Sequence, residues 1–353
     1  MKIIPAGNLA KKIFLSNIDS LKLPYKLTFA VTYNCNSKCN TCNIWKKTKI
    51  SELTLKEIEK FSENSNFFSW FNLTGGEPFL RKDLVQIVNA FLKNSKDFFL
   101  LNITTNGLLT NLIHDKVEEM LSLDIPRMVT VVSLDGPKEI NDNIRGMAGS
   151  YDKAIYTYQL LRDLSRNHKN FETYLGYTIS PLNLGKIEDT VSSVKDAIPD
   201  TKPKDFHFNL FHVSKHYYSN LKDSLQEYKE RVMKDLETIQ RIKGTSLNPI
   251  QFLEEKYIKL AKKFIEDKKT PLPCKAIQTS CFLDPEGNVY PCTVFDKKLG
   301  NIKDFAYDLK ELLKLDFVKH VEKDVRELRC PNCWTPCEAY QIILGNISKL
   351  LIK

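Results

Sequence analysis

The sequence has no long apolar run, no export signal and no block of like charge. No segment of the 353 residues approaches the roughly 18 consecutive apolar residues of a membrane span. Residues 1–20 mix polar residues into their apolar part and form a poor secretory signal. These absences predict a cytoplasmic protein without integral membrane contact. Lys and Arg (52) exceed Asp and Glu (43), but the two signs are interleaved, which argues against a nucleic-acid partner.

Cysteine is absent from residues 43–273, so the nine cysteines form two groups, at residues 35–42 and 274–337. Without an export signal, nine cysteines argue against a disulfide framework. They indicate metal or redox chemistry instead, and their clustering is what two metal sites would produce.

The first group lies in residues 33–45, YNCNSKCNTCNIW, directly after an apolar run at residues 27–31 that predicts a buried strand. Cys35, Cys39 and Cys42 can therefore converge on one centre. Three thiolates would leave one iron of a 4Fe-4S cluster without a protein ligand, whereas structural zinc usually takes a closed set of four. The spacing favours the iron-sulfur cluster, and zinc or a structural role is the alternative.

Strand-like and helix-like segments alternate six times after residue 26. The predicted strands are residues 27–31, 70–73, 99–103, 128–134, 173–179 and 206–211, and the helices between them are 53–64, 82–95, 112–123, 151–167 and 185–198. Apolar strands with intervening helices imply a parallel sheet with right-handed crossovers. We therefore predict an α/β fold, a partial (β/α)6 open TIM-like barrel.

The remaining segments predict smaller units around this barrel. We expect an N-terminal extension (1–24), the barrel (25–215), a helical connection (216–270) with helices over 221–243 and 249–267, and a small α+β domain (271–353) ending in a helix over 338–353. About 25 residues before the first strand are too few for a fused leader-peptide-binding domain. The oligomeric state is not predicted.

A polar or glycine-rich turn follows each predicted strand. In a parallel barrel these turns share the C-terminal rim, where active sites are built, with the cysteine loop. In the turn TGGEP, Gly75 and Gly76 would let a ligand approach the backbone, and Glu77 offers an acceptor for an ammonium group. Taken alone, the turn is better explained as a plain tight turn.

With CNSKCNTC after the first strand and GGEP after the second, the chain resembles the radical SAM superfamily. The resemblance implies that Cys35, Cys39 and Cys42 ligate a 4Fe-4S cluster whose open iron binds S-adenosylmethionine (SAM). It further implies that Gly75, Gly76 and Glu77 hold the methionyl amino group. Thr41 departs from the family, since many members have an aromatic residue there; Trp45 is the expected substitute near the adenine.

Three later residues lie where the family often contacts SAM. Asn106 and Ser133 are expected at the ribose and carboxylate, and Arg145 is expected to pair with the carboxylate. Loop capping is the alternative for Asn106 and Ser133, and a surface ion pair is the alternative for Arg145.

The second cysteine group contains a predicted hairpin, FLDPEGNVY, which places Cys292 at the end of a strand. The spacings Cys274-x12-Gly287-x4-Cys292 and Cys330-x2-Cys333 resemble the SPASM or shorter twitch domain. This resemblance implies one auxiliary 4Fe-4S cluster on Cys274, Cys292, Cys330 and Cys333, with Cys337 the substitute for one of the last pair. Cys281 is expected to pack in the core, and zinc is the alternative metal.

These features together predict a radical SAM enzyme. A reductant such as flavodoxin or ferredoxin would supply the electron that cleaves SAM to a 5′-deoxyadenosyl radical. This radical would abstract a hydrogen from a peptide or small-molecule substrate, and an electron would pass to the auxiliary cluster. The alternative is a non-catalytic iron-sulfur or zinc protein that senses redox state or binds a partner.

Overall fold

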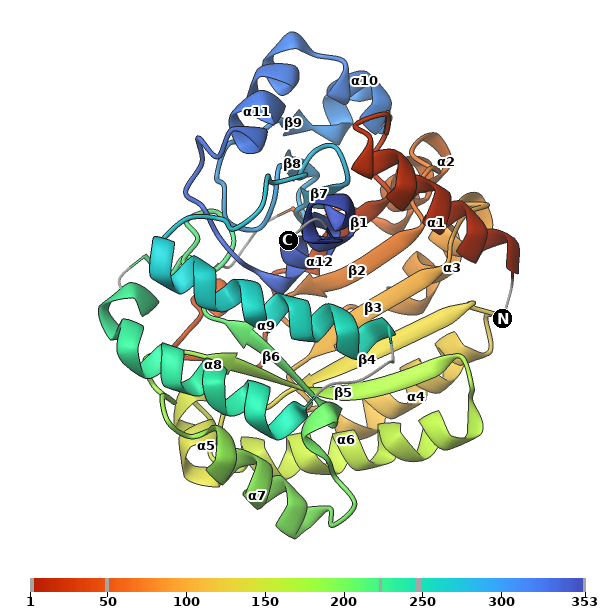
Figure 1. Ribbon diagram of the computed structural model, residues 1–353. Coiled ribbons are helices and arrows are strands. Elements are labelled where there is room, and N and C mark those ends of the chain that lie inside the picture. Colours follow the sequence, from red (N-terminus) through yellow and green to blue (C-terminus); the bar gives the residue numbers. More distant parts are fainter. Residues whose placement is uncertain (1–2, 48–50, 222–223, 245–248, 352–353) are drawn as a thin grey trace.

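The computed structural model describes residues 3–47, 51–221, 224–244 and 249–351. Within them, one sheet has the strand order β6-β5-β4-β3-β2-β1-β7-β8-β9 (Figure 1). Its first six strands are β1 (Lys26–Thr32), β2 (Trp70–Gly75), β3 (Leu100–Thr105), β4 (Arg127–Ser133), β5 (Phe171–Ile179) and β6 (Phe206–Leu210). Each pairs in parallel with the next, which confirms the predicted strands and their order.

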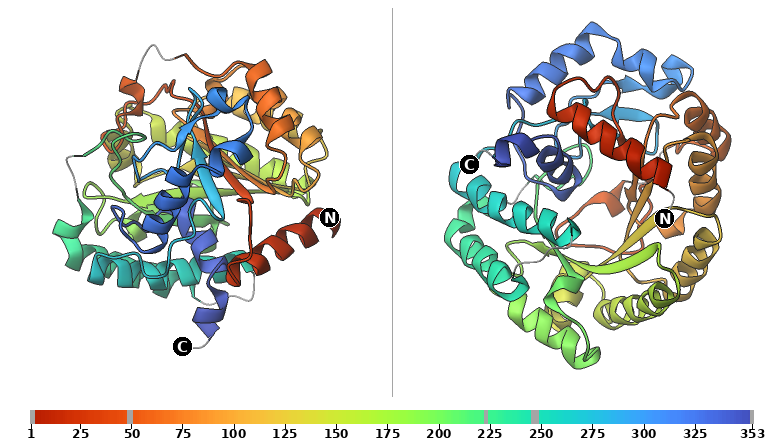
Figure 2. Two further views of the ribbon diagram at one scale, coloured as in Figure 1. Left: turned by 90° about the horizontal axis from the view of Figure 1, so that it is seen from above. Right: turned by 45° about the vertical axis from the view of Figure 1, so that its right-hand side comes forward.

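The helices between these strands lie on the outside of the curved sheet (Figure 2). They are α2 (Leu55–Asn64), α3 (Leu84–Asn94), α4 (Thr110–Leu121), α5 (Lys138–Arg145), α6 (Ser150–Asn167) and α7 (Ile187–Ala197). All five predicted crossover helices are present. The sequence did not predict α5, because its eight residues bury only two positions, or α1 (Ile3–Asn17) in the N-terminal extension.

Local chemistry fixes where α2 begins. Thr54 caps the helix: its side chain accepts a hydrogen bond from the backbone N–H of Glu57, and the Glu57 carboxylate accepts one from the backbone N–H of Thr54 at 2.8 Å. This capping box satisfies two backbone donors that a helix start leaves free. It places α2 directly after the segment that leads away from the cysteine loop.

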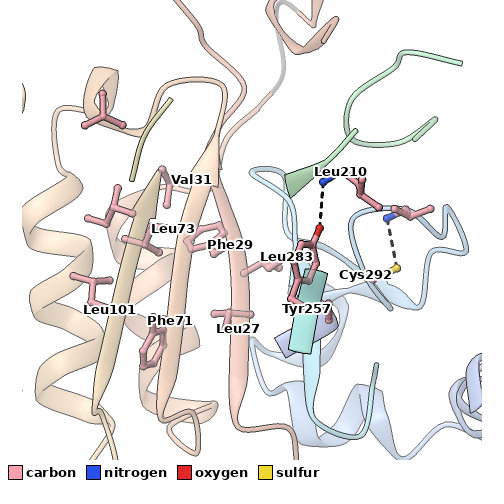
Figure 3. Close-up of a cluster of buried hydrophobic side chains, with 14 of the residues drawn as sticks. Leu27, Phe29, Val31, Phe71, Leu73, Leu101, Leu210, Tyr257, Leu283 and Cys292 are labelled. Carbon is pink, nitrogen blue, oxygen red and sulfur yellow. Dashed lines mark hydrogen bonds between the residues drawn. The ribbon is translucent and has the colours of Figure 1, made fainter. Parts of the chain in front are cut away.

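The strands present two different faces. Leu27, Phe29 and Val31 of β1 point to the same side as Phe71 and Leu73 of β2, where they form the core beneath the helices (Figure 3). The alternate positions face the barrel interior, since successive side chains of a strand point to opposite faces. The interior positions are largely polar, and the C-terminal half of the chain closes over them.

Two long helices follow β6. These are α8 (Lys229–Lys243), after a short 3-10 turn at Leu225–Tyr228, and α9 (Pro249–Asp267). The helix predicted over 221–243 therefore begins late; residues 222–223 lie outside the described ranges. The Tyr257 hydroxyl of α9 accepts a hydrogen bond from the backbone N–H of Leu210 at 3.1 Å, which fixes α9 against β6 (Figure 3).

The C-terminal segment continues the barrel sheet. Strand β7 (Ser280–Leu283) pairs in parallel with β1, with Leu27 opposite Cys281, and β8 (Asn288–Tyr290) returns antiparallel to β7. The predicted hairpin is confirmed, but its pairing with β1 was not predicted. Cys281 is fully buried in the core, as its expected packing role requires.

The chain then ends in short elements: β9 (Gly300–Asn301), α10 (Leu309–Leu313), α11 (Asp316–Arg326), α12 (Pro336–Leu344) and α13 (Ile347–Leu351). The helix predicted over 338–353 is interrupted at Gly345 and Asn346, and residues 352–353 lie outside the described ranges. Among the described residues, every helix is too short or too polar to cross a membrane. The predicted domain boundaries remain predictions.

Candidate functional site

A cavity of about 340 Å³ opens at the carboxyl ends of the parallel strands and extends into the barrel. All three cysteines of the first loop line it. So do Gly75 and Gly76 after β2, and Asn106, Ser133 and Arg145 from later rim segments. The structure therefore brings together every predicted SAM-site residue except Glu77, which does not line the cavity.

The first cysteine loop is surrounded by hydrogen-bond donors. The Ser37 backbone N–H donates to the Cys35 sulfur at 3.5 Å, and the Ser37 hydroxyl lies 3.2 Å from the Cys39 sulfur. Asn106 donates to Cys35 and Arg145 to Cys39, each at 3.9 Å. Donors of this kind stabilise sulfur that carries negative charge.

Burial opposes that charge in the absence of a metal. It raises the pKa of Cys35 to about 11 and that of Cys42 to about 12. Cys35 and Cys42 are thus costly to ionise, although the loop supplies hydrogen-bond donors to its sulfurs. This combination matches a site completed by a metal cluster, because a bound metal supplies the missing positive charge. The donor set thus fits a cluster with three cysteine ligands.

The two glycines join β2 to the cysteine loop. The Gly76 N–H donates to the Thr32 carbonyl and the Glu77 N–H to the Asn34 carbonyl, both at 2.8 Å. A Cβ atom on Gly75 would lie 2.1 Å from the Thr32 oxygen, and one on Gly76 would lie 2.2 Å from the Asn34 oxygen. Glycine is therefore required here so that the second motif can lie directly against the first.

Glu77 is fully buried behind the cavity wall. Its carboxylate accepts hydrogen bonds from the Asn106 N–H at 2.7 Å, the Thr105 hydroxyl at 2.9 Å and the Phe79 N–H at 3.2 Å. Burial raises its pKa to about 7, and these donors act in the opposite direction. Glu77 thus ties the ends of β2 and β3 together. Its expected contact with the methionyl amino group remains a prediction.

Arg145 is paired inside the cavity wall. One guanidinium nitrogen lies 2.5 Å from the Asp135 carboxylate, while its Nε is buried without a hydrogen-bond partner. The sequence did not single out Asp135. Asn106 donates to the Asn36 side chain at 2.7 Å, and Ser133 stands at the end of β4. The roles of Asn106, Ser133 and Arg145 toward SAM remain predictions.

The segment after β6 lines the cavity beside the glycine turn, where the Tyr217 hydroxyl donates to the Gly75 carbonyl at 3.3 Å. The Tyr217 hydroxyl lies 2.8 Å from that of Thr74, and the Tyr218 carbonyl accepts from the Asn43 N–H at 2.8 Å. Trp45 also lines the cavity, as does Thr41, and the buried indole N–H of Trp45 has no partner. Neither tyrosine was predicted from the sequence, because residues 216–218 lie in a polar stretch without a recognisable motif.

The second cysteine group comes from distant segments. Cys274, Cys292 and Cys333 are buried, and Cys330 is half-buried. The Cys292 sulfur accepts from the N–H groups of Val294 and Phe295 at 3.4 and 3.3 Å. The neighbouring Cys333 thiol and burial together raise the pKa of Cys292 well above its usual value. These thiols therefore lie close enough to influence one another.

No three His, Cys, Asp or Glu side chains of the described residues lie close enough to share one metal ion. A 4Fe-4S cluster places its ligands on separate irons. Cys337 differs from the other C-terminal cysteines because it lines the barrel cavity, where Asn72 donates to its sulfur at 3.9 Å and Lys26 donates to its carbonyl at 2.6 Å. Which cysteines ligate an auxiliary cluster remains a prediction.

Two family models match the chain. The radical SAM superfamily model covers residues 29–194, and the SPASM iron-sulfur cluster-binding domain covers residues 274–334. The chain therefore belongs to the radical SAM superfamily and carries a C-terminal SPASM domain. Its cofactors are 4Fe-4S clusters and SAM.

Similar curated proteins have different products. The antilisterial bacteriocin subtilosin biosynthesis protein AlbA of Bacillus subtilis (strain 168) is 26% identical over 325 residues, which are 87% of this chain and 64% of AlbA. The AdoMet-dependent heme synthase of Methanosarcina barkeri (strain Fusaro / DSM 804) is 24% identical over 304 residues, 80% of each protein. This chain thus spans less than two thirds of AlbA.

Solved structures share the fold. SuiB of Streptococcus suis bound to S-adenosylmethionine aligns with a TM-score of 0.58 at 18% identity, over 88% of this chain and 70% of SuiB. AnSMEcpe with bound AdoMet aligns with a TM-score of 0.56 at 17% identity, over 93% of this chain and 99% of that one. These likenesses confirm the predicted α/β radical SAM fold.

Proposed function

We propose that this protein cleaves SAM reductively and uses the resulting radical to abstract a hydrogen atom from a substrate in the barrel cavity. The observation that carries the proposal is the contact of the glycine turn with the cysteine loop on the wall of one cavity. Cys35, Cys39 and Cys42 would hold a 4Fe-4S cluster, which in its reduced form would supply the electron for this cleavage. Flavodoxin or ferredoxin is the proposed reductant.

The surrounding residues would hold SAM and exclude water. The methionyl amino group would lie against the backbone of Gly75 and Gly76, and Arg145, Asn106 and Ser133 line the same cavity. The aromatic side chains of Trp45, Tyr217 and Tyr218 line the same cavity. Apolar side chains at this wall would help to keep water away from a reactive radical.

The fate of the substrate radical depends on the second cysteine group. We propose one auxiliary 4Fe-4S cluster on Cys274, Cys292, Cys330 and Cys333 that accepts an electron, so that the net reaction is a two-electron oxidation. The polar barrel interior favours a polar substrate, either a peptide or a small molecule. The similarity to a bacteriocin biosynthesis protein supports the peptide.

A non-catalytic redox sensor is the second candidate. A sensor does not need an amino-acid-binding turn packed against its cluster, so the glycine contacts favour the enzyme. Anaerobically reconstituted protein is incubated with SAM and a strong reductant, and 5′-deoxyadenosine is quantified. We expect it to form; its absence under strong reductant favours the sensor. Iron analysis and EPR test the cluster count, and fewer than about seven irons per chain contradict two clusters.

A further inference from the structure

Several titratable side chains line the barrel cavity without a role in the proposed SAM site, among them Lys26, His207, His212 and Tyr340. His207 is the one that faces a buried carboxylate. His207 lies on β6, three residues before the point where α9 is fixed to the strand, and its ring lines the cavity. Its Nδ1 lies 3.4 Å from the Glu254 carboxylate of α9. Its Nε2 is buried and has no hydrogen-bond partner. A buried imidazole nitrogen without a partner requires an explanation.

Glu254 is buried as well, with 3% of its surface exposed. One carboxylate oxygen pairs with Lys243 of α8, and the other, which faces His207, has no geometrically satisfactory hydrogen bond. Tyr340 of α12 also lines the cavity, beside this carboxylate. Two polar atoms without a hydrogen-bond partner, the His207 Nε2 and one Glu254 oxygen, thus lie at the same part of the cavity wall.

Glu254 also borders a second cavity. This cavity has a volume of about 220 Å³ and lies between α8 and α9, lined by Gln240, Lys243, Gln251 and Glu255 among others. His207 faces the barrel cavity, and Glu254 stands between His207 and the second cavity. The two side chains therefore lie between the barrel cavity and the second cavity.

The surrounding helices hold this pair in register. Besides its bond to Leu210, the Tyr257 hydroxyl donates to the Trp334 carbonyl at 3.1 Å, and the Trp334 indole donates to the Tyr257 carbonyl at 2.9 Å. Because Tyr257 lies one helical turn after Glu254, these bonds set the position of the carboxylate opposite His207.

We propose that His207 is the proton acceptor of the barrel cavity and that Glu254 is its positioning residue, passing the proton toward the second cavity. The inference rests on the proposed function. A carboxylate 3.4 Å from Nδ1 favours the tautomer that carries its proton on Nδ1, and this tautomer leaves Nε2 free to accept a proton. Burial lowers the pKa of His207, so the ring is neutral and able to accept.

The proposed reaction balances with this acceptor. The reacting substrate carbon bears an O–H or N–H group. Its C–H bond breaks, and the hydrogen atom passes to the 5′-deoxyadenosyl radical, which becomes 5′-deoxyadenosine. The carbon radical then loses one electron to the auxiliary cluster of the proposed function. The O–H or N–H bond breaks, its proton forms an N–H bond at Nε2, and the carbon gains a double bond to oxygen or nitrogen. The inference therefore specifies an alcohol or amine carbon as the reacting group.

The charged and titratable groups around His207 are few. Glu254 of α9 and Glu172 of β5 favour its protonated form, and Lys243 of α8 opposes it. The Tyr174 ring of β5 packs on the imidazole at a centroid distance of 4.1 Å. Removing the Glu254 charge should therefore lower the pKa of His207 further.

The test is NMR of the reconstituted holoenzyme labelled with 15N in its imidazoles. The chain has six histidines, and the His207→Gln spectrum identifies the signal of His207. We expect the Nδ1–H tautomer to exceed the Nε2–H tautomer by at least about tenfold, as a hydrogen bond to a carboxylate supports. In Glu254→Gln this preference should be lost and the pKa of His207 should fall. Glu266→Gln, at an exposed position of the same helix, is the matched control and should change neither the tautomer ratio nor the pKa of His207.

A predominant Nε2–H tautomer in the wild-type protein overturns the proposal, because that nitrogen could not accept a proton. An unchanged tautomer ratio and pKa in Glu254→Gln overturns the positioning role. If Glu254→Gln does not fold, the wild-type ratio still decides the first point. The measurement needs no turnover, so it is independent of SAM cleavage. If 5′-deoxyadenosine forms but the Nε2–H tautomer predominates, only this inference is refuted. If the Nδ1–H tautomer predominates but no 5′-deoxyadenosine forms, only the proposed function is refuted.

Discussion

The two cysteine groups are built in different ways. Cys35, Cys39 and Cys42 come from one short loop, and polar donors from neighbouring rim segments reach their sulfurs. The C-terminal cysteines come from segments that only the tertiary fold brings together, and most of them are buried. The first site thus depends on local geometry beside an open cavity, whereas the second depends on the packing of the whole C-terminal half.

The largest effect should separate the two groups by chemistry. We expect Cys35→Ala to abolish 5′-deoxyadenosine formation and to remove about four irons per chain, because one cluster loses a ligand. Cys333→Ala should also remove about four irons but retain SAM cleavage. Iron analysis and product quantification check both variants. If Cys35→Ala still cleaves SAM, the proposal that only the first cysteine group holds the SAM-cleaving cluster is contradicted.

The next effect tests whether local geometry controls the first site. In Gly76→Ala the new Cβ would lie 2.2 Å from the Asn34 carbonyl, so the cysteine loop must shift. Since a displacement of about 1 Å can cost on the order of a hundredfold in rate, we expect a loss of that size in SAM cleavage. Gly7→Ala, which meets nothing within 4 Å, is the control. Equal rates in both variants would contradict this dependence.

A core substitution should affect the second group more than the first. Trp334 is fully buried beside Cys333, and its indole donates to the Tyr257 carbonyl. We expect Trp334→Ala to lower the free energy of unfolding by about 3–5 kcal/mol. Chemical denaturation followed by fluorescence and by cluster absorbance measures this loss. If the auxiliary-cluster absorbance of the variant is lost at the same denaturant concentration as in the wild type, this packing does not control the second site.

The smallest effect concerns pH. Burial lowers the pKa of His212 to about 4, so between this value and its ordinary value of 6.5 the unfolded chain binds more protons than the folded one. The contribution of neutral His212 to the free energy of unfolding is therefore fully present above pH 6.5. It is lost as the pH falls toward 4, by up to about 3 kcal/mol. His212→Gln should show a shallower decline in thermal unfolding between pH 7 and 5, and His114→Gln should not.

Sequence patterns identified the fold because its strands and crossover helices are long and regular. They also identified residues whose chemistry depends on spacing along the chain, such as the cysteines and Gly75–Gly76. They could not identify contacts between distant segments. The pairing of β7 with β1, the Asp135–Arg145 pair and the His207–Glu254 pair each join elements whose order gives no sign of the contact. The burial of Glu77 was missed because its motif predicts a rim position, while its three donors come from neighbouring segments.

The pairing of β7 with β1 has a consequence for biosynthesis. Because β1 emerges from the ribosome early and β7 late, one edge of β1 stays without its partner while most of the chain is made. At about 5–20 residues per second, this interval lasts many seconds. Unpaired strand edges promote association between chains. Slow synthesis or delayed insertion of the C-terminal cluster should therefore lower the yield of native protein even when the barrel itself carries no change.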